Sequence, residues 1–398
     1  MLNETAVAAY WPGKFDEAAL QSWAEELRAR LAASRIALGL VYMSPRFFPH
    51  AQTVLEILRV HAQIPLLLGS SSTGLIFGDQ EEEDSSGLVL GLYTLPGAQL
   101  LACHFTQSQL EESNGPSYWH AETGVLPGQC NGWLAFVDPF HLNTEGWLNA
   151  WNQAYPGCPI LGGLASGDPS EQRTQLYLNG EVYETGGVGV AFSGEIQLAH
   201  VIAQGCIPIG ETWTITKADR NLIYEIGNRP AYKVLADTYN SLSIEDQKKT
   251  RGNLFIGLVV NEYLEEFRQG DFLIRNLLGA DARSGVLAVG AFPRQGQTIQ
   301  FQRRDAAAAT LELTALLKET GAGLSGATLQ GGCLCCCNGR GQRLFGMPHH
   351  DASLVQRTLA VPGLVGLFCN GEIGPVGKQN FLHGYTASLA LFVKPSAA

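Results

Sequence analysis

Apolar positions recur with two different spacings along the chain. Between residues 15 and 33 they return every three or four positions, which predicts an amphipathic helix with Asp16 as its N-cap. The unbroken apolar run 36–43 is typical of a buried strand, and a second helical pattern at 51–63 separates it from another such run at 64–68. A strand, a helix and a strand in this order predict a parallel pair joined by a crossover helix.

The same alternation continues to the end of the chain. We expect strands at 87–94, 132–138, 159–164, 186–192, 196–203, 213–217, 253–260, 285–291, 327–337, 364–369 and 387–393, and helices at 143–155, 229–239, 305–320 and 350–360. The runs 186–192 and 196–203 flank a short Gly-containing turn, so we expect them to pair as a hairpin, and 80–86 reads as a charged loop.

Parallel pairs together with a hairpin indicate mixed sheets. The sequence therefore predicts an α/β to α+β fold, with two associated domains whose mixed β-sheets are flanked by helices. The expected divisions are a helical N-terminal extension at 1–34, a first domain at 35–228 and a second domain at 229–398.

Composition excludes several classes of protein. With 45% hydrophobic and 16% charged residues the chain is not disordered, and its 46 glycines show no collagen-like period. The net charge is −11 and no basic stripe is visible, so nucleic acid and membrane surfaces are poor candidate partners. Three adjacent cysteines at 335–337, among 9 in all, favour free thiols in a reducing cytoplasm. No leader segment or spanning apolar run is visible, so we expect a cytoplasmic protein.

Three predicted strands end in small polar turns. The runs 66–69, 160–164 and 365–369 lead into SSSTG, ASGD and NGEIG. Each turn places glycine beside short polar side chains, including Ser70 and Ser166, at the carboxyl end of a strand, where α/β proteins bind ligands. The pattern predicts a shared pocket, and the alternative is three ordinary tight turns.

Charged and amide side chains beside such turns suggest which ligand could bind. Arg340 carries a planar fork suited to a carboxylate, and Asn338 can both donate and accept. Glu372, beside Asn370, could hold an ammonium group, so the two charges together would recognise a zwitterion. Alternatively, Arg340 forms a structural ion pair with Glu372 or Asp351.

The thiols and histidines of the C-terminal third allow two further interpretations. Cys333, Cys335, Cys336 and Cys337, with His349, His350 and Cys369, are metal-ligand types, but alternate strand positions face opposite ways. We therefore expect no metal and no cofactor, and a core position for Cys335 and a neighbour. Cys337 at a strand end, with His383 downstream, leaves a thiol-dependent hydrolase or transferase as a less favoured alternative. Asp351 is a candidate N-cap for the helix at 350–360.

Two residues of the middle region complete the candidate ligand contacts. Trp213 is either a stacking wall for a ligand or a core aromatic. Lysine side chains are usually exposed to solvent, yet Lys217 lies two strand positions after Ile215 and could share a buried face of the strand with it. The turn 70–74 lacks the lysine and the spacing of a phosphate-binding loop, which argues against nucleotide hydrolysis.

Long ordered motifs carry a family resemblance. The segments ILGGLASGD (160–168), GCIPIGETWTITKADRNLIYEIGNRPAYKVL (205–235), CCCNGRGQRLFGMPHHDASLVQRTL (335–359) and PGLVGLFCNGEIGPVGKQNFLHGYTASLALF (362–392) resemble the FIST family, named for F-box and intracellular signal transduction proteins. The resemblance implies a sensory module that binds small molecules such as amino acids. Residues 1–34 are too few for an F-box, and no output domain follows the last strand, so we expect signalling through a separate partner or by dimerisation.

Our leading hypothesis is thus a cytosolic sensor of an amino acid or similar small zwitterion. An interaction adaptor without a ligand is the alternative from a different class. The resemblance brings no reaction with it, so we favour a non-enzymatic role. The candidate ligand-binding residues are Ser70, Ser166, Trp213, Lys217, Cys337, Asn338, Arg340, Asn370, Glu372 and His383.

Overall fold

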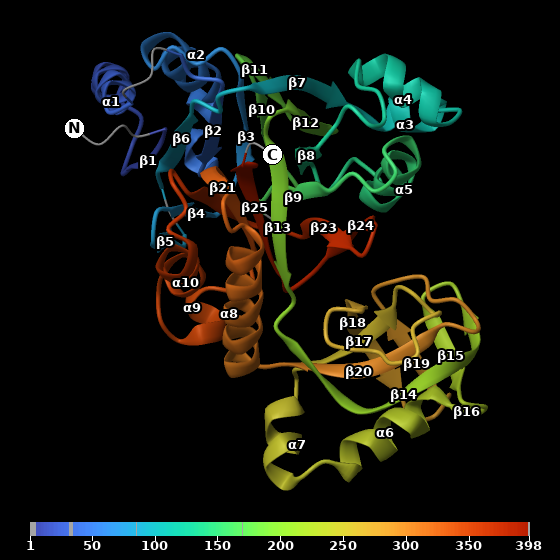
Figure 1. Cartoon of the computed structure of the whole chain (residues 1–398). Coiled ribbons are helices and arrows are strands. Elements are labelled where there is room, and N and C mark those ends of the chain that lie inside the picture. Colours follow the sequence, from blue (N-terminus) through green and yellow to red (C-terminus); the bar gives the residue numbers. More distant parts are fainter. Residues whose placement is uncertain (1–4, 32–34, 85, 169, 397–398) are drawn as a thin grey trace. The chain divides into compact units, whose positions relative to one another are not determined.

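The computed structural model describes residues 5–31, 35–84, 86–168 and 170–396. The chain divides into two compact units (Figure 1). The first unit runs to Ile202 and resumes at Thr314, and the second unit comprises Ala203–Leu313. None of the helices in the described ranges is long and apolar enough to cross a bilayer.

Three modules with a common strand plan make up the first unit. The first module contains β1 (Ala6–Trp11), α1 (Glu17–Ala29), β2 (Leu38–Met43), a 3₁₀ helix (Pro45–His50), α2 (Ala51–His61), β3 (Leu67–Ser71), β4 (Gly74–Phe77), β5 (Gln80–Glu82) and β6 (Leu88–Tyr93). The second module contains β7 (Ala98–Phe105), α3 (Gln107–Glu112), α4 (Pro116–Thr123), β8 (Gly132–Val137), α5 (Thr144–Ala154), β9 (Ile160–Leu164), β10 (Leu176–Leu178), β11 (Glu181–Tyr183) and β12 (Gly187–Gly194). The third module contains β13 (Gln197–Ala203), α8 (Ala306–Gly323), β21 (Thr328–Cys337), α9 (Gln342–Phe345), α10 (His350–Leu359), β22 (Val365–Cys369), β23 (Glu372–Val376), β24 (Gln379–His383) and β25 (Ala387–Lys394). Helix α8 begins within the second unit and belongs to the first unit from Thr314 onward.

A parallel strand pair lies at the centre of each module. The pairs β2–β3, β8–β9 and β21–β22 are joined by the crossover helices α2, α5 and α10, as the sequence pattern predicts for a strand–helix–strand unit. On one side of each pair lies an antiparallel strand, which is β6 beside β2, β12 beside β8 and β25 beside β21. The edge strand beyond it is β1, β7 and β13, respectively. Helix α1 begins at its predicted N-cap, because the Asp16 carboxylate accepts a hydrogen bond from the Ala19 amide at 3.0 Å.

The modules exchange β-hairpins in a ring. The hairpin β4–β5 of the first module pairs with β22 of the third, β10–β11 of the second pairs with β3 of the first, and β23–β24 of the third pairs with β9 of the second. The result is three six-stranded sheets of the same order: β1-β6-β2-β3-β10-β11, β7-β12-β8-β9-β23-β24 and β13-β25-β21-β22-β4-β5. Each exchanged hairpin also contacts the crossover helix of the module it enters, through β5 on α10, β11 on α2 and β24 on α5.

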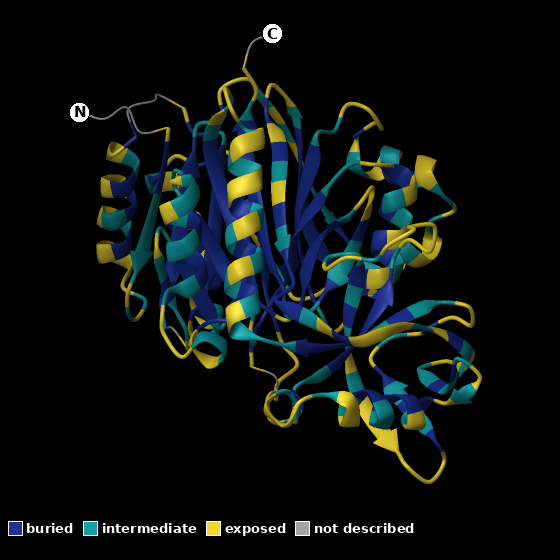
Figure 2. Cartoon of the chain, turned by 60° about the horizontal axis from the view of Figure 1, so that its bottom comes forward, coloured by how far each residue is buried: buried dark blue, intermediate teal, exposed yellow. Residues whose placement is uncertain are grey.

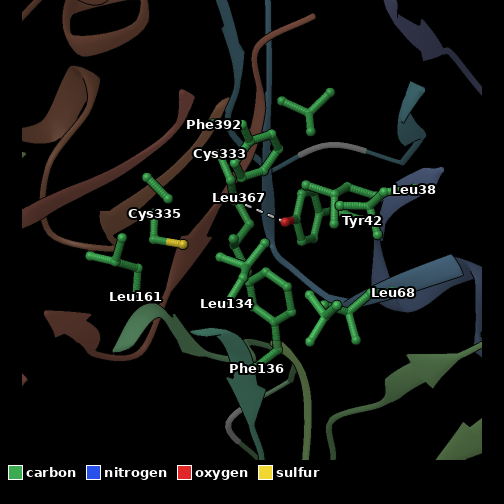
Figure 3. Close-up of a cluster of buried hydrophobic side chains, with 14 of the residues drawn as sticks. Leu38, Tyr42, Leu68, Leu134, Phe136, Leu161, Cys333, Cys335, Leu367 and Phe392 are labelled. Atoms are coloured by element: carbon green, nitrogen blue, oxygen red, sulfur yellow. Dashed lines mark hydrogen bonds between the residues drawn. The ribbon is translucent and has the colours of Figure 1, made fainter. Parts of the chain in front are cut away.

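A shared apolar core joins the three modules. Tyr42 of the first module, Phe136 of the second and Cys333 of the third belong to one buried cluster (Figure 3). The rings of Tyr42 and Phe136 meet edge to face, and the Tyr42 hydroxyl lies 3.0 Å from the Cys333 sulfur. Burial raises the pKa of Tyr42 well above its ordinary value, so its hydroxyl stays protonated. Figure 2 shows the strands of this unit largely buried and its helices exposed along one face.

One glycine in each parallel pair permits a close approach between strands. A Cβ on Gly69 would lie 1.7 Å from the carbonyl oxygen of Val41, and one on Gly162 or Gly366 would lie 1.9 Å from a backbone carbonyl oxygen of the parallel neighbour. Contacts that short do not occur, so these three positions require the absence of a side chain.

The second unit is a small barrel. It contains β14 (Cys206–Asp219), β15 (Leu222–Ile226), β16 (Arg229–Pro230), α6 (Ala231–Ser241), α7 (Ile244–Thr250), β17 (Leu254–Val259), β18 (Phe272–Asp281), β19 (Val286–Val289) and β20 (Thr298–Arg304). The strand order is β14-β20-β17-β18-β19-β15-β16, and an additional β14–β15 pairing closes the ring. Val234 and Leu235 of α6 pack into the barrel core with Ile256 and Leu287.

The predicted fold class is confirmed, but the strand pairing differs in one place. The runs at 186–192 and 196–203 are strands, yet they do not form a hairpin, because β12 and β13 belong to different sheets. The segment 80–86 contains strand β5 with a buried Glu81 rather than a charged loop, and its residue 85 lies outside the described residues.

The compact units also divide the chain differently from the predicted domains. The expected boundary between residues 228 and 229 falls inside the second unit, at the turn between β15 and β16. The segment 1–34, expected to be helical, also contributes β1 to a sheet, and its residues 1–4 and 32–34 lie outside the described residues. The long-range exchange of hairpins, which joins early and late strands in one sheet, explains why the units do not follow chain order.

Candidate functional site

The carboxyl ends of β3, β9, β21 and β22 meet in the first unit. We call Ser72, Thr73, Ser166, Asn338 and Asn370 the loop junction, because each follows one of these strands. The Thr73 amide donates to Ser166 Oγ at 3.0 Å, and the Thr73 hydroxyl donates to Asn338 Oδ1 at 3.3 Å. Asn338 Nδ2 donates to Asn370 Oδ1 at 2.8 Å. These bonds connect all three modules.

The loop junction has a buried base and an accessible rim. The hydroxyls of Ser72 and Ser166, both buried, each donate to the Phe368 carbonyl oxygen at 2.7 Å. Asn338 and Asn370 are exposed, and Thr73 is partly exposed. The base therefore fixes the loops, whereas the rim presents amide and hydroxyl groups that can both donate to and accept from a small polar molecule.

Cys337 adjoins the rim at the end of β21. Its sulfur accepts a hydrogen bond from the Gly339 amide at 3.5 Å, and its own amide donates to the Thr386 carbonyl oxygen at 3.0 Å. The side chain is partly exposed, in contrast to Cys335 and Cys336, which are buried. Alternation along the strand puts Cys335 in the shared core and turns Cys336 towards Asp351, whose Oδ2 lies 3.6 Å from the sulfur.

A buried ion pair supports the turn that carries Asn338. Arg340 Nε and Nη2 donate to Asp351 at 2.6 Å and 3.0 Å, and both side chains are 0% exposed. The guanidinium also lies over the Phe345 ring at 5.3 Å. Burial would raise the pKa of Asp351, but Arg340 and His350 outweigh it and hold that pKa below its ordinary range. Asp351 is not the N-cap of α10, since His349 occupies that position and Asp351 lies in the first turn.

Glu372 is likewise buried. It begins β23 with a relative exposure of 0%, and its Oε2 accepts from the Thr386 amide at 2.9 Å. The Cys369 thiol donates to its Oε1 at 3.3 Å. Neither Arg340 nor Glu372 therefore reaches the surface in this structure. A direct clamp on a zwitterion stays a prediction, and it requires the Arg340–Asp351 pair to open.

A third buried carboxyl lies on the exchanged hairpin β4–β5. Glu81 is 3% exposed, and its Oε1 accepts from the Ala352 amide of α10 at 2.8 Å. Its Oε2 has no hydrogen-bond partner among the described residues. Burial, together with the nearby charge of Asp351, raises the pKa of Glu81 to about 7.

The other predicted contacts lie apart from the rim. Ser70 is buried within β3, opposite Leu176 of β10. His383 is the strand partner of Glu372, and its Nε2 lies 3.0 Å from the Gly374 carbonyl oxygen.

Trp213 and Lys217 belong to β14 of the second unit, whereas the loop junction consists of residues of the first unit. The Lys217 ammonium lies 5.7 Å from the centre of the Tyr224 ring, and the Arg229 guanidinium lies 6.0 Å from that of the Trp213 ring. Ser72, Thr73 and Glu81 are not among the candidates from the sequence. The turn motif SSSTG contains Ser72 and Thr73 and is the signal that points to both, whereas Glu81 lies in an acidic run that resembles an exposed loop.

Fold and site together define a protein of two compact units, one built from three hairpin-exchanging modules and one a small barrel. Models of the FIST N domain and the FIST C domain match residues 37–229 and 231–375. The chain therefore belongs to the FIST family, whose domains are associated with sensory functions in signal transduction.

Relatives extend along most of the chain. An uncharacterized protein of Mycobacterium tuberculosis (strain CDC 1551 / Oshkosh) is 35% identical over 370 residues, which cover 93% of this chain and 94% of the relative. An uncharacterized protein of Mycobacterium bovis is 34% identical over the same proportions of both chains. Among solved structures, cyanuric acid hydrolase from A. caulinodans aligns over 98% of this chain and 100% of its own, with 9% identity and a TM-score of 0.34. A likeness that weak carries no conclusion about fold or activity.

Proposed function

We propose that this chain is a sensory protein that binds a small polar molecule at the loop junction and passes the signal to a partner protein. The observation that carries the proposal is the chain of hydrogen bonds from Thr73 through Asn338 to Asn370, in which side chains from different modules meet at an accessible rim. A ligand that bonds to this rim bridges the modules. Its binding free energy then stabilises one arrangement of the three loops over others.

The leading candidate ligand is an amino acid or a similar small zwitterion. Amide side chains suit such a molecule, because each offers both a donor and an acceptor to its ammonium and carboxylate groups. Arg340 and Asp351 act from beneath the rim by holding the turn that presents Asn338. In the alternative form of the proposal, the ligand carboxylate displaces Asp351 and pairs with Arg340 itself.

A thermal-unfolding screen tests the proposal directly. We expect one or more members of an amino-acid panel, supplied at about 1 mM, to raise the melting temperature, because a ligand that binds only the folded state stabilises it. Asn338→Ala and Asn370→Ala should remove the shift. Gln379→Ala, which truncates an exposed amide on β24, is the matched control and should keep it.

Two results would overturn the proposal. One is the absence of any shift across a panel that also includes amides, sugars and organic acids. The other is a shift that both rim variants retain in full. Isothermal titration with a ligand that raises the melting temperature then distinguishes direct binding to Arg340 from binding to the rim alone. If Arg340 contacts the ligand carboxylate, Arg340→Lys should weaken binding of that ligand but not binding of its amide derivative.

A further inference from the structure

Two cysteine side chains lie together at the amino ends of β8 and β9. Cys130 and Cys158 each precede their strand by two residues, and the Cys158 thiol donates to the Cys130 sulfur across 3.4 Å. Because Trp133 of β8 pairs with Ile160 of β9, these ends belong to neighbouring parallel strands. Such backbones lie about 4.8 Å apart, a separation that a disulfide can span after small side-chain rotations.

The same two thiols are accessible from outside. Both side chains are partly exposed, and both line a cavity of about 180 Å³ bordered by the turns at Gly128 and Gly157. By contrast, the cysteines at 333, 335, 336 and 369 are buried. A small oxidant can therefore reach this pair without unfolding the sheet.

We propose that Cys130 and Cys158 form a dithiol that hydrogen peroxide oxidises to an intramolecular disulfide, with Cys130 as the attacking residue. The Cys130 thiol first loses its proton to solvent, and the thiolate attacks one peroxide oxygen. The O–O bond breaks, hydroxide leaves, and Cys130 becomes a sulfenic acid. The Cys158 sulfur then attacks the Cys130 sulfur, and the sulfenic hydroxyl leaves as water. Two thiols and one peroxide give one disulfide and two waters, so the two sulfurs supply both electrons.

The direction of the hydrogen bond between the sulfurs supports these two roles, because the Cys130 thiol donates to the Gly132 carbonyl oxygen at 3.3 Å and its sulfur accepts from Cys158. Donation from the Cys158 thiol lowers the pKa of Cys130, because it stabilises the thiolate form. The same bond, followed by burial, raises the pKa of Cys158, which keeps its proton until the second step. Cys158 is held in place by its amide, which donates to the carbonyl oxygen of the buried Tyr155 at 3.1 Å.

Peptide mapping of the native full-length chain after peroxide treatment tests the inference. The expected product is a peptide pair that joins Cys130 to Cys158, two hydrogens lighter than the sum of its parts, and dithiothreitol should restore both thiols. Cys158→Ser should stop at a Cys130 sulfenic acid that dimedone captures, and Cys130→Ser should give neither product. Cys103→Ser is the matched control, since burial raises the pKa of that thiol to about 12, and it should behave as the wild type. Circular dichroism checks that each variant is folded.

Three outcomes would overturn the inference. In the first, both cysteines are recovered as separate reduced peptides although peroxide has oxidised other thiols of the folded chain. In the second, the cross-link forms equally fast in the urea-unfolded chain. In the third, the purified protein already contains the disulfide, and dithiothreitol does not reduce it. The oxidised protein should also melt at a higher temperature than the reduced one, because the cross-link restricts the unfolded chain. The inference goes beyond the proposed function, since none of its steps involves the loop junction.

Discussion

Arg340 and Asp351 form a two-point ion pair in which neither side chain is exposed to solvent. The pair joins the turn after β21 to the first turn of α10, and Asn338 lies two residues before Arg340 on that turn. The geometry of the rim therefore depends on a buried guanidinium that has lost its hydration and that donates two hydrogen bonds to the Asp351 carboxylate.

Removal of Asp351 should accordingly destabilise the protein severely. We expect Asp351→Ala to cost about 3–5 kcal/mol in urea unfolding, since it removes the carboxylate that accepts two hydrogen bonds from the buried guanidinium. Glu184→Ala, which breaks an exposed pair with Arg173, should cost less than about 1 kcal/mol. The double variant Arg340→Met/Asp351→Leu should recover part of the loss. Equal costs for the buried and the exposed pair would contradict this account.

The close approach at Gly366 makes a second prediction. Gly366→Ala should lower stability by about 2 kcal/mol or more, because its Cβ would meet the carbonyl oxygen of Leu334 at 1.9 Å and one of the two backbones must move. Gly189 of β12 is the matched control, since the nearest atom to its added Cβ lies at 3.6 Å. Gly189→Ala should change stability by less than about 1 kcal/mol. Similar denaturation midpoints for the two variants would refute the steric argument.

The exchanged hairpin β23–β24 provides a third prediction. Asn380, which is 2% exposed, accepts from the Ile160 amide at 2.8 Å and donates to Asn152 Oδ1 at 2.8 Å and to the Cys158 carbonyl oxygen at 2.9 Å. Asn380→Ala removes all three side-chain bonds, although the backbone amide of residue 380 still donates to Asn152 Oδ1, and it should cost about 2–4 kcal/mol. Gln379→Ala, at the neighbouring exposed position, should be nearly neutral. Hydrogen exchange should show faster opening of β24 in Asn380→Ala only, and unchanged protection there would count against an anchoring role.

The parallel pairs and their helices were predictable because their signals are local. A continuous apolar run, a helical period and a second run specify β2–α2–β3 within residues 38–71, and the same holds for the pairs of the other two modules. Sheet membership is not local. Two apolar runs around a short turn look alike whether they pair with each other or, as β12 and β13 do, enter different sheets.

The candidate site was predictable to a similar extent. The three small polar turns stand out in the sequence, and the structure joins residues of all three by hydrogen bonds. Their chemistry depends on long-range packing. From the sequence, Glu372 and Asp351 are equally good candidates to form an ion pair with Arg340. The position of α10 against β21 places Asp351 where its carboxylate accepts two hydrogen bonds from Arg340.

Glu81 should make the stability of the protein depend on pH. Its pKa in the folded protein is about 7, above the value of 4.5 expected for an exposed glutamate. Between these two pH values the folded state binds more protons than the unfolded state. The contribution of Glu81 to stability is therefore complete below pH 4.5 and is lost as pH rises through 7.

The variant Glu81→Gln tests this dependence, because it removes the charge and keeps an acceptor for the Ala352 amide. At pH 8 the variant should therefore be more stable than the wild type by on the order of 1–3 kcal/mol, and at pH 5 the gap should narrow. Glu82→Gln, at the next position of β5, is the control, and denaturation at the two pH values measures the effect. A gap that is the same at both values would show that the Glu81 carboxyl titrates alike in the folded and unfolded chains.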